Sequence, residues 1–232
     1  MYEKYLKRLF DFIFALIAVI VISPLLLILT AIGTITMKGN PFFVQKRPGR
    51  MDDKTGDAKI FKLIKFRTMS NAKDKGGQLL PDEKRINRYG KFLRSTSLDE
   101  LPELFNIIRG DMAIIGPRPQ LVRDMTFMNS EQNKRHSVRP GLTGLAQVNG
   151  RNNITWEKKF EYDLCYINNG ISFKGDLKLI CQTIGKVLAR CDIVREGTSS
   201  DMDYGDWLLQ EGKISEEEYK EKQLAANELL KI

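Results

Sequence analysis

An almost wholly apolar segment at residues 12–36 constrains the fold of this 232-residue chain more than any other feature. As a straight helix, its roughly 25 residues span about 37 Å, which is long enough to cross a lipid bilayer. The segment is a poor secretory signal, because its apolar region is too long and no small-residue cleavage site follows it. We therefore predict a protein that associates with a membrane through its N-terminal part.

Two features argue against a plain membrane span. Ser23 and Pro24 stand at the middle of the apolar segment, where proline removes a backbone donor and kinks a helix. Cationic side chains flank both ends, and the positive-inside tendency would place both ends in the cytoplasm. They are Lys4, Lys7 and Arg8 before the segment, and Lys38, Lys46, Arg47 and Arg50 after it. The residues alone leave two readings open: a helix in residues 1–38 that enters and leaves one leaflet, or a single span that tolerates its proline.

The composition narrows the chemistry. Lys and Arg number 37 against 29 Asp and Glu, and the net charge of +8 favours an anionic partner: nucleic acid, anionic lipid or a phosphorylated substrate. The three cysteines show no Cys-x-x-Cys spacing and His136 is the only histidine, which argues against a disulfide framework, a zinc site or a histidine-based triad. Catalysis is therefore expected to depend on carboxylates, lysines and arginines.

The residues after the apolar segment change to a strand pattern. Residues 42–45 and 60–66 are rich in apolar side chains and enclose a polar stretch at 52–57. This pattern predicts a β-hairpin with a somewhat long loop. Lys62 and Lys65 differ in parity, so a regular strand places them on opposite faces.

Helical patterns follow the predicted hairpin. A charged helix is predicted over residues 82–93, because Pro81-Asp82 supplies a start signal. Amphipathic helices are predicted over 156–166 and 177–189. The second of these either faces the core or lies in the membrane surface.

The tail beyond residue 197 looks separate from the rest. Residues 197–200 are linker-like, and the Ser-Glu-Glu-Glu run that begins at Ser215 is a capping-box pattern that starts a final helix. Residues 210–219 resemble the small helical-hairpin modules known as short C-terminal domains, which are often linked to oligomerisation. A solvated, charged terminal helix is the other reading.

Asp99 and Glu100 form the most informative acidic pair. Asp99 can be read as a helix N-cap, which would put Pro102 where its missing N–H costs nothing. The other reading is catalytic, because carboxylates among fixed cations suit phosphoryl transfer, and a carboxylate can act as the nucleophile. A diphosphate substrate also requires neutralisation by cations such as Mg²⁺. Among those cations Arg118 is the strongest candidate, because the prolines on either side of it stiffen its backbone.

Several short motifs occur along the chain in a fixed order. They are Lys7-Arg8 and Asp11 before the Ser23-Pro24 break, Gln45-Lys46-Arg47-Pro48-Gly49, Phe61-Lys62, Lys65-Phe66-Arg67-Thr68-Met69, Arg94-Ser95, Ser97-Leu98-Asp99-Glu100-Leu101-Pro102, Gly110-Asp111-Met112, Gly116-Pro117-Arg118-Pro119, Arg139-Pro140-Gly141-Leu142-Thr143-Gly144 and Gln147-Val148-Asn149-Gly150-Arg151. Together they resemble the bacterial sugar transferases, the small monotopic phosphoglycosyl transferases that begin glycoconjugate assembly. The resemblance extends from the N-terminus to about Glu196.

The resemblance implies a two-step reaction at the cytoplasmic face of the inner membrane. Asp99 would attack the β-phosphate of a UDP-sugar, release UMP and hold the phosphosugar covalently until polyprenyl (undecaprenyl) phosphate takes it. Glu100 would assist as a base or organise the site, and Mg²⁺ would bridge Asp99 and the diphosphate. By the same resemblance, phosphate contacts fall to Lys65, Arg94 and Arg118, and a nucleotide contact falls to Arg151.

The resemblance also settles the reading of the N-terminal segment in favour of a re-entrant helix bent at Ser23 and Pro24. The predicted fold is a mixed α/β domain, mainly helical, that sits on the membrane and contains a small β-hairpin. We divide the chain into a re-entrant membrane helix (1–38), a catalytic domain (39–196) and a helical tail (197–232). Because the tail resembles an oligomerisation module, the formation of a homo-oligomer is left open.

A function of a different class also fits the charge and the apolar segment: a membrane-tethered basic module that binds nucleic acid or anionic lipid. It leaves the Asp99-Glu100 pair and Arg118 unexplained, and the sequence shows no base-stacking motif. We therefore predict an enzyme whose partners are a UDP-sugar, a polyprenyl phosphate and the membrane, and not nucleic acid. The sequence identifies neither the sugar nor the pathway.

Overall fold

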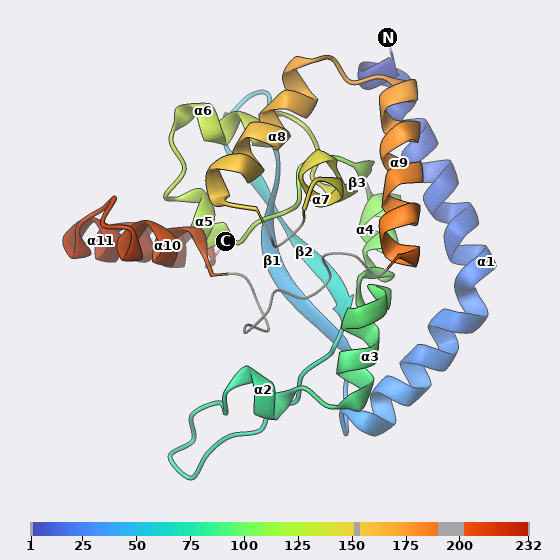
Figure 1. The fold of residues 1–232 in the computed structure, drawn as a ribbon, viewed down its shortest axis with the longest axis vertical. Helices are drawn as coiled ribbons and strands as arrows, with labels where there is room; N and C mark the ends of the chain where they lie inside the picture. The colour runs from blue at the N-terminus through green and yellow to red at the C-terminus, as the bar shows by residue number, and fades with distance from the viewer. Residues whose placement is uncertain (1, 151–153, 190–201, 232) are drawn as a thin grey trace.

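The computed structural model describes residues 2–150, 154–189 and 202–231. The fold is mainly helical with a small antiparallel sheet, so the predicted mixed α/β, mainly helical class is confirmed. Figure 1 shows the long helix α1 (Lys7–Thr36) along one side of the molecule and the strands β1 (Phe42–Met51) and β2 (Ala58–Phe66) through its middle. Helices α10 (Tyr204–Gln210) and α11 (Glu216–Leu229) lie on the side opposite α1.

Helix α1 stays continuous through Ser23 and Pro24, and its axis curves around the body of the molecule (Figure 1). Proline has no N–H to donate to the carbonyl four residues earlier, which here belongs to Ile20. The Ser23 hydroxyl donates to that carbonyl instead, at 2.8 Å. The Ser-Pro pair therefore lets the helix bend while the Ile20 carbonyl keeps a hydrogen bond.

Both ends of α1 are attached to the same body. Near the start of the helix, the Arg8 guanidinium donates at 2.6 and 2.8 Å to two carbonyls in the last turn of α4 (Glu103–Arg109). Near its end, the Leu29 carbonyl accepts the Tyr89 hydroxyl at 2.7 Å. The helix therefore lies along the body rather than projecting from it.

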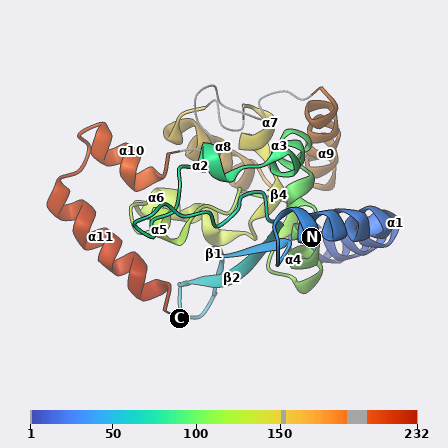
Figure 2. The same cartoon turned by 90° about the horizontal axis from the view of Figure 1, so that it is seen from below.

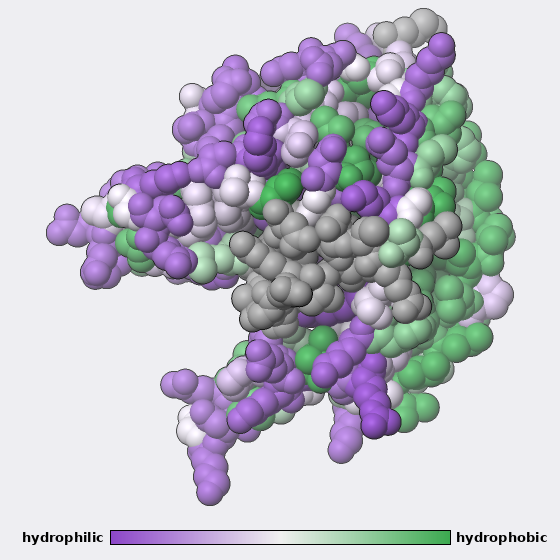
Figure 3. Space-filling view, in the orientation of Figure 1, coloured by the Kyte–Doolittle hydropathy of each residue, from purple (hydrophilic) through white to green (hydrophobic). Residues whose placement is uncertain are grey.

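The two faces of α1 differ in their surroundings. The buried face packs on the body at Lys7, Asp11, Ala15, Leu26, Leu29 and Gly33. The other face is apolar, and Val21, Leu27 and Ile35 on it are 71%, 71% and 76% exposed. Figure 3 shows this face as a hydrophobic surface along one edge of the molecule. By length and composition α1 could cross a membrane, yet one face of it is held sideways against the body over most of its length.

The predicted β-hairpin is present, with longer strands than predicted. Strands β1 and β2 pair antiparallel from Phe42 opposite Phe66 to Pro48 opposite Ile60, after which the register shifts. Lys62 is exposed, whereas the Lys65 side chain is largely buried. The prediction that these two lysines lie on opposite faces is therefore confirmed.

Asn106 in α4 joins that helix to the hairpin. Its side chain is fully buried, its Oδ1 accepts the N–H of Ile64 at 3.1 Å, and its Nδ2 donates to the Lys62 carbonyl at 2.7 Å. Apolar side chains of α1, β2 and α4 form the core around it: Ala15, Phe61, Leu63, Leu104 and Ile107, with Met112. Helix α4 is thus enclosed between the N-terminal helix and the hairpin, and its first turn lies near Lys65.

The prediction of a single helix over residues 82–93 is wrong. The structure has two helices there, α2 (Asp82–Arg85) and α3 (Arg88–Thr96). Ile86 between them is extended and forms a β-bridge with Met69, and the Asn87 side chain caps α3 by accepting the N–H of Gly90 at 2.8 Å. The N-cap at Asn87 starts a new helix where charge patterning predicted a continuous one.

The two predicted amphipathic helices are confirmed as α8 (Trp156–Asn168) and α9 (Phe173–Leu188). Helix α9 lies beside α1 in Figure 1, and Asp176 near its start accepts from Lys7 at 2.6 Å. Leu179 is buried, while Leu177 and Ile184 are exposed. One face of α9 therefore packs on the body, and apolar side chains elsewhere on the helix are exposed.

The tail forms a helical hairpin of α10 and α11 that packs on the body. Ser215 caps α11, as predicted, by accepting the N–H of Glu218 at 3.1 Å. The apolar side of α10 joins a buried cluster of Phe127, Met128, Trp156, Phe160, Tyr204 and Leu208. The predicted linker at 197–200 lies outside the described residues, and the homo-oligomer and the division into three parts stay predictions. The remaining elements are short: β3 (Ala113–Ile115) paired in parallel with β4 (Gly141–Thr143), α5 (Val122–Met125), α6 (Ser130–Asn133) and α7 (Leu145–Val148).

Candidate active site

A sharp turn between α3 and α4 carries Asp99 and Glu100, which are both partly buried. Ser97 ends α3 in the left-handed conformation, with φ of 57°, and a short 3₁₀ turn over Leu98–Glu100 follows. Helix α4 begins only after Pro102, and no side chain caps its first turn. The reading of Asp99 as the N-cap of this helix is therefore wrong.

Glu100 is held by two cations from distant parts of the chain. Its Oε1 accepts from Lys65 Nζ at 2.9 Å and from Arg118 Nη2 at 2.7 Å. Burial would raise the pKa of Glu100, but the charges and hydrogen bonds of Arg118 and Lys65 outweigh it and hold this pKa well below its usual range. Glu100 is therefore an ionised carboxylate in a fixed position.

Glu103 belongs to the same cluster, although the sequence interpretation missed it. It is 2% exposed, and its Oε1 lies 3.0 Å from Lys65 Nζ. Burial raises its pKa to about 7, against the opposing charge of Lys65. The available signal was the three-residue spacing from Glu100, which puts both carboxylates beside one lysine, but an acidic residue in a first helical turn is ordinary. Lys65 thus bridges Glu100 and Glu103.

Asp99 differs from these two carboxylates. Within the part of the chain that the structure describes, its carboxylate oxygens form no hydrogen bond or ion pair. Burial and then the neighbouring charge of Glu100 raise its pKa to about 6, although Lys65, Arg118 and Arg94 oppose this. Asp99 is therefore the available carboxylate of the cluster, surrounded by positive charge without being bound to it.

The backbone around Arg118 is fixed from two directions. Its carbonyl accepts from Arg135 Nη2 at 2.7 Å, and Arg135 in turn pairs with Asp163, both fully buried. The next carbonyl, that of Pro119, accepts from Arg47 Nη1 at 3.2 Å. The Arg118 side chain is 41% exposed, so its guanidinium can bind Glu100 and still offer donors to a ligand.

The other two predicted phosphate and nucleotide contacts have different outcomes. Arg94 donates from Nε to the Thr68 hydroxyl at 3.1 Å, and its charge acts on Asp99. Arg151 lies outside the described residues. The structure thus brings Lys65, Arg94, Asp99, Glu100 and Arg118 together and leaves the role of Arg151 a prediction.

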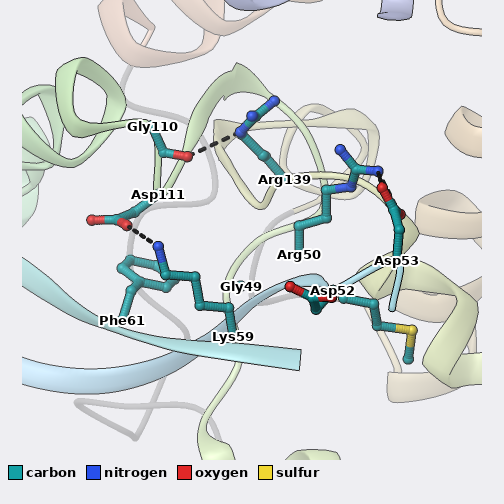
Figure 4. A pocket seen from close by; sticks show the side chains of 10 residues that line it. Gly49, Arg50, Asp52, Asp53, Lys59, Phe61, Gly110, Asp111 and Arg139 are labelled. Atoms are coloured by element: carbon teal, nitrogen blue, oxygen red, sulfur yellow. Dashed lines mark hydrogen bonds and ion pairs between the residues drawn. The ribbon is translucent and has the colours of Figure 1, made fainter. Parts of the chain in front are cut away.

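A cavity of about 240 Å³ lies apart from this cluster, near the tip of the hairpin (Figure 4). None of the cluster residues lines it. Its charged groups have partners: Arg50 pairs with Asp53 at 2.8 Å, Lys59 with Asp111 at 3.8 Å, and Arg139 donates to the Gly110 carbonyl. The cavity is therefore separate from the cluster around Asp99.

The described residues leave room for ligands from a substrate around a divalent cation. The described residues contain no group of three His, Cys, Asp or Glu side chains that could hold a metal ion. The Asp99 carboxylate is available, and Mg²⁺ commonly uses one or two carboxylates together with substrate phosphates and water. The residues present therefore fit a Mg²⁺ ion that binds together with a phosphorylated substrate.

An available carboxylate among fixed cations suits an enzyme of the phosphoryl-transfer class. The chain belongs to the bacterial sugar transferase family, whose model matches residues 2–190. It is therefore a phosphoglycosyl transferase.

Relatives in other bacteria support this assignment. The chain is 45% identical to the uncharacterized sugar transferase EpsL of Bacillus subtilis over 183 residues, which cover 79% of this chain and 87% of that protein. It is 42% identical over 195 residues to a UDP-glucose:undecaprenyl-phosphate glucose-1-phosphate transferase of Klebsiella pneumoniae, and 35% identical over 206 residues to a UDP-galactose-lipid carrier transferase of Erwinia amylovora. These matches cover 78% and 81% of this chain but only 39% and 41% of the two longer proteins.

Proposed function

We propose that this enzyme transfers a phosphosugar from a UDP-sugar to undecaprenyl phosphate through a covalent phosphosugar on Asp99, as the first membrane step of glycoconjugate assembly. The observation that carries the proposal is the available Asp99 carboxylate next to Glu100, which Lys65 and Arg118 hold in place. The names of the Klebsiella and Erwinia relatives support the substrate classes.

The proposed reaction has two displacements at one phosphorus atom. In the first, an Asp99 oxygen attacks the β-phosphate of the UDP-sugar, the bond from that phosphorus to the bridging oxygen breaks, and UMP leaves with that oxygen. In the second, a phosphate oxygen of undecaprenyl phosphate attacks the same phosphorus and displaces the Asp99 carboxylate. The product is a diphosphate-linked sugar on the lipid, and Asp99 returns to its starting state.

The surrounding residues position charge in this scheme. Arg118 and Lys65 face the carboxylates and can stabilise the negative charge that builds up on the transferred phosphoryl group. Glu100 keeps these two cations in place and can also act as a base. A Mg²⁺ ion bound at Asp99 would neutralise charge on the diphosphate.

We propose that α1 is re-entrant, with both ends on the cytoplasmic side of the inner membrane. The support is its sideways attachment: one face is buried on the body from Lys7 to Gly33, and the other is apolar and exposed (Figure 3). A helix that crossed the bilayer would have to carry the charged body into lipid, which is costly. The exposed side chain of Phe173 in α9 extends this surface, because its ring centroid lies 5.5 Å from that of Phe10 in α1.

The direct test is UMP release by the full chain in nanodiscs with undecaprenyl phosphate, Mg²⁺ and a panel of UDP-sugars. We expect one or a few sugars to give UMP and a lipid-linked product in equal amounts. Omitting undecaprenyl phosphate should leave at most one UMP per enzyme, because the phosphosugar then stays on Asp99. If folded protein releases UMP with none of the sugars, the proposal is wrong.

The pH dependence of the reaction should follow Asp99. Because burial and Glu100 raise the pKa of Asp99 to about 6, lowering the pH through this value protonates the nucleophile and removes activity. We expect kcat/KM for the UDP-sugar, which reports the free enzyme, to rise with pH, bend near the pKa of Asp99 and then level off. Initial rates of UMP release across the range of about pH 5 to 8 would test this. A flat profile across this range, as expected of an aspartate with its ordinary carboxyl pKa, would contradict it.

A further inference from the structure

The C-terminal hairpin of α10 and α11 is bonded to the chain that follows Arg118. Asp124 in α5 is 2% exposed and uses both carboxylate oxygens: Oδ2 accepts the N–H of Leu121 at 3.0 Å, and Oδ1 accepts the N–H of Tyr204 at 2.9 Å. Beside this bond, Arg123 pairs with Asp203. A single buried carboxylate thus joins the first residue of α10 to the segment that connects Arg118 with α5.

The same junction is closely packed. Gly205 in α10 faces the ring of Phe127, and a Cβ built on Gly205 would lie 2.5 Å from that ring. Tyr204 packs between Trp156 and Phe160, and its hydroxyl lies 3.0 Å from Gln132 Nε2. Any side chain at position 205 would therefore push α10 away from the body.

The far end of the C-terminal hairpin contacts Lys46, the neighbour of the Arg47 that holds the backbone next to Arg118. The Lys46 ammonium donates to the Leu230 carbonyl at 2.7 Å, and Figure 2 shows the C-terminus near the strands of the β-hairpin. The neighbouring Arg47 holds the Pro119 carbonyl at 3.2 Å. The C-terminal hairpin therefore contacts α5, which follows Arg118, and strand β1, whose Arg47 holds the residue next to Arg118.

We propose that the C-terminal hairpin is a positioning element for Arg118, which it acts on through Asp124 and the Gly205–Phe127 contact. This inference rests on the proposed function, because it assumes that Arg118 binds substrate phosphate. The matched family region ends at residue 190, so this role belongs to a segment outside that region. Displacing α10 lets the segment after Arg118 move and leaves the guanidinium misplaced relative to Glu100 and the phosphate.

The test begins with Gly205→Ala in the full chain. Gly205 does not have a positive φ, and alanine favours a helix over glycine, so the substitution disturbs docking rather than the helix. Gly185→Ala in α9 is the matched control, because among the described residues no atom beyond the helix's own backbone and the chain neighbours of Gly185 lies within 4 Å of the added methyl group. The chain has two tryptophans, and both Trp156 and Trp207 lie in or against the cluster that joins the hairpin to the body. Their fluorescence should shift to the red in Gly205→Ala and stay unchanged in Gly185→Ala.

The kinetic measurement is kcat/KM for the UDP-sugar. A displacement of a positioned group by about 1 Å can cost about a hundredfold in rate, so we expect Gly205→Ala to lower kcat/KM by roughly tenfold to a hundredfold. Gly205→Leu, with a larger side chain against the same ring, should lower it further. In an Arg118→Lys background, chosen to keep a cation and measurable turnover, Gly205→Ala should have almost no additional effect.

The outcomes separate this inference from the proposed function. A wild-type enzyme that releases no UMP would remove the proposed function, whatever the fluorescence shows. If UMP is released and the fluorescence shows displaced helices in Gly205→Leu with kcat/KM unchanged, the positioning role is wrong. The positioning role is also wrong if Gly205→Ala lowers kcat/KM by the same factor in the wild type and in the Arg118→Lys variant. The loss would then come from general destabilisation.

Discussion

Asp99→Asn is expected to lower UMP release by at least about a thousandfold, which is the scale seen when a catalytic nucleophile is removed. Asparagine has the shape of aspartate, but its amide does not attack phosphorus. Asp99 makes no hydrogen bond or ion pair within the described residues, so the exchange breaks no contact there. The raised pKa of Asp99 shows that the folded protein disfavours its charge, so the thermal midpoint should stay level or rise.

The control for this substitution is Asp53→Asn. The Asp53 side chain is 81% exposed in its pair with Arg50, and exposed pairs contribute little to stability. We expect wild-type UMP release from it. A second measurement is mass spectrometry of the protein after exposure to the UDP-sugar without lipid, in which only the wild type should gain a phosphosugar. Full activity in Asp99→Asn would remove the nucleophile assignment and leave the enzyme class standing.

Chelation of divalent cations is expected to reduce UMP release to background, and excess Mg²⁺ to restore it. The site has cations for the phosphates, but Lys65 and Arg118 are already bound to Glu100. A diphosphate that approaches Asp99 therefore needs further positive charge close to the reacting phosphorus. UMP release in the presence of EDTA, then with added Mg²⁺, measures this requirement.

The same geometry predicts how the metal binds. The described residues hold no three-ligand cluster, so Mg²⁺ titrated into the free protein should show no tight binding by calorimetry. Its apparent affinity should rise when the UDP-sugar is present, because the phosphates supply the missing ligands. EDTA saturated with Mg²⁺ beforehand is the control and should not inhibit. Tight Mg²⁺ binding by the free protein would contradict this account.

Local patterns predicted much of the fold. The apolar segment became α1, the strand pattern became the hairpin, and parity placed Lys62 and Lys65 on opposite faces. These features depend on neighbours in the sequence, which a local reading captures. The break between α2 and α3 was missed, because it depends on a β-bridge from Ile86 to Met69, 17 positions away along the chain.

The sequence predicted most residues of the candidate site but not the contacts between them. Motif order brought Lys65, Asp99, Glu100 and Arg118 forward as candidates, and the structure places them together. The sequence could not show that Glu100, rather than Asp99, receives both cations. Nor did it show Glu103, because the pairing with Lys65 requires the contact between α4 and β2 that Asn106 creates.

Helix α4 has seven residues, Glu103 to Arg109, and it connects two very different environments. Its first turn carries Glu103 toward Lys65, and the carbonyls of its last turn receive Arg8 at the base of α1. The helix is therefore a rigid spacer of about 10 Å between the apolar anchor and the reacting groups. Its length sets the spacing between Glu103 at one end and the carbonyls that hold Arg8 at the other, and its rotation sets their relative directions. One inserted residue would turn its two ends by about 100° relative to each other, so it would part either Glu103 from Lys65 or Arg8 from its two carbonyls.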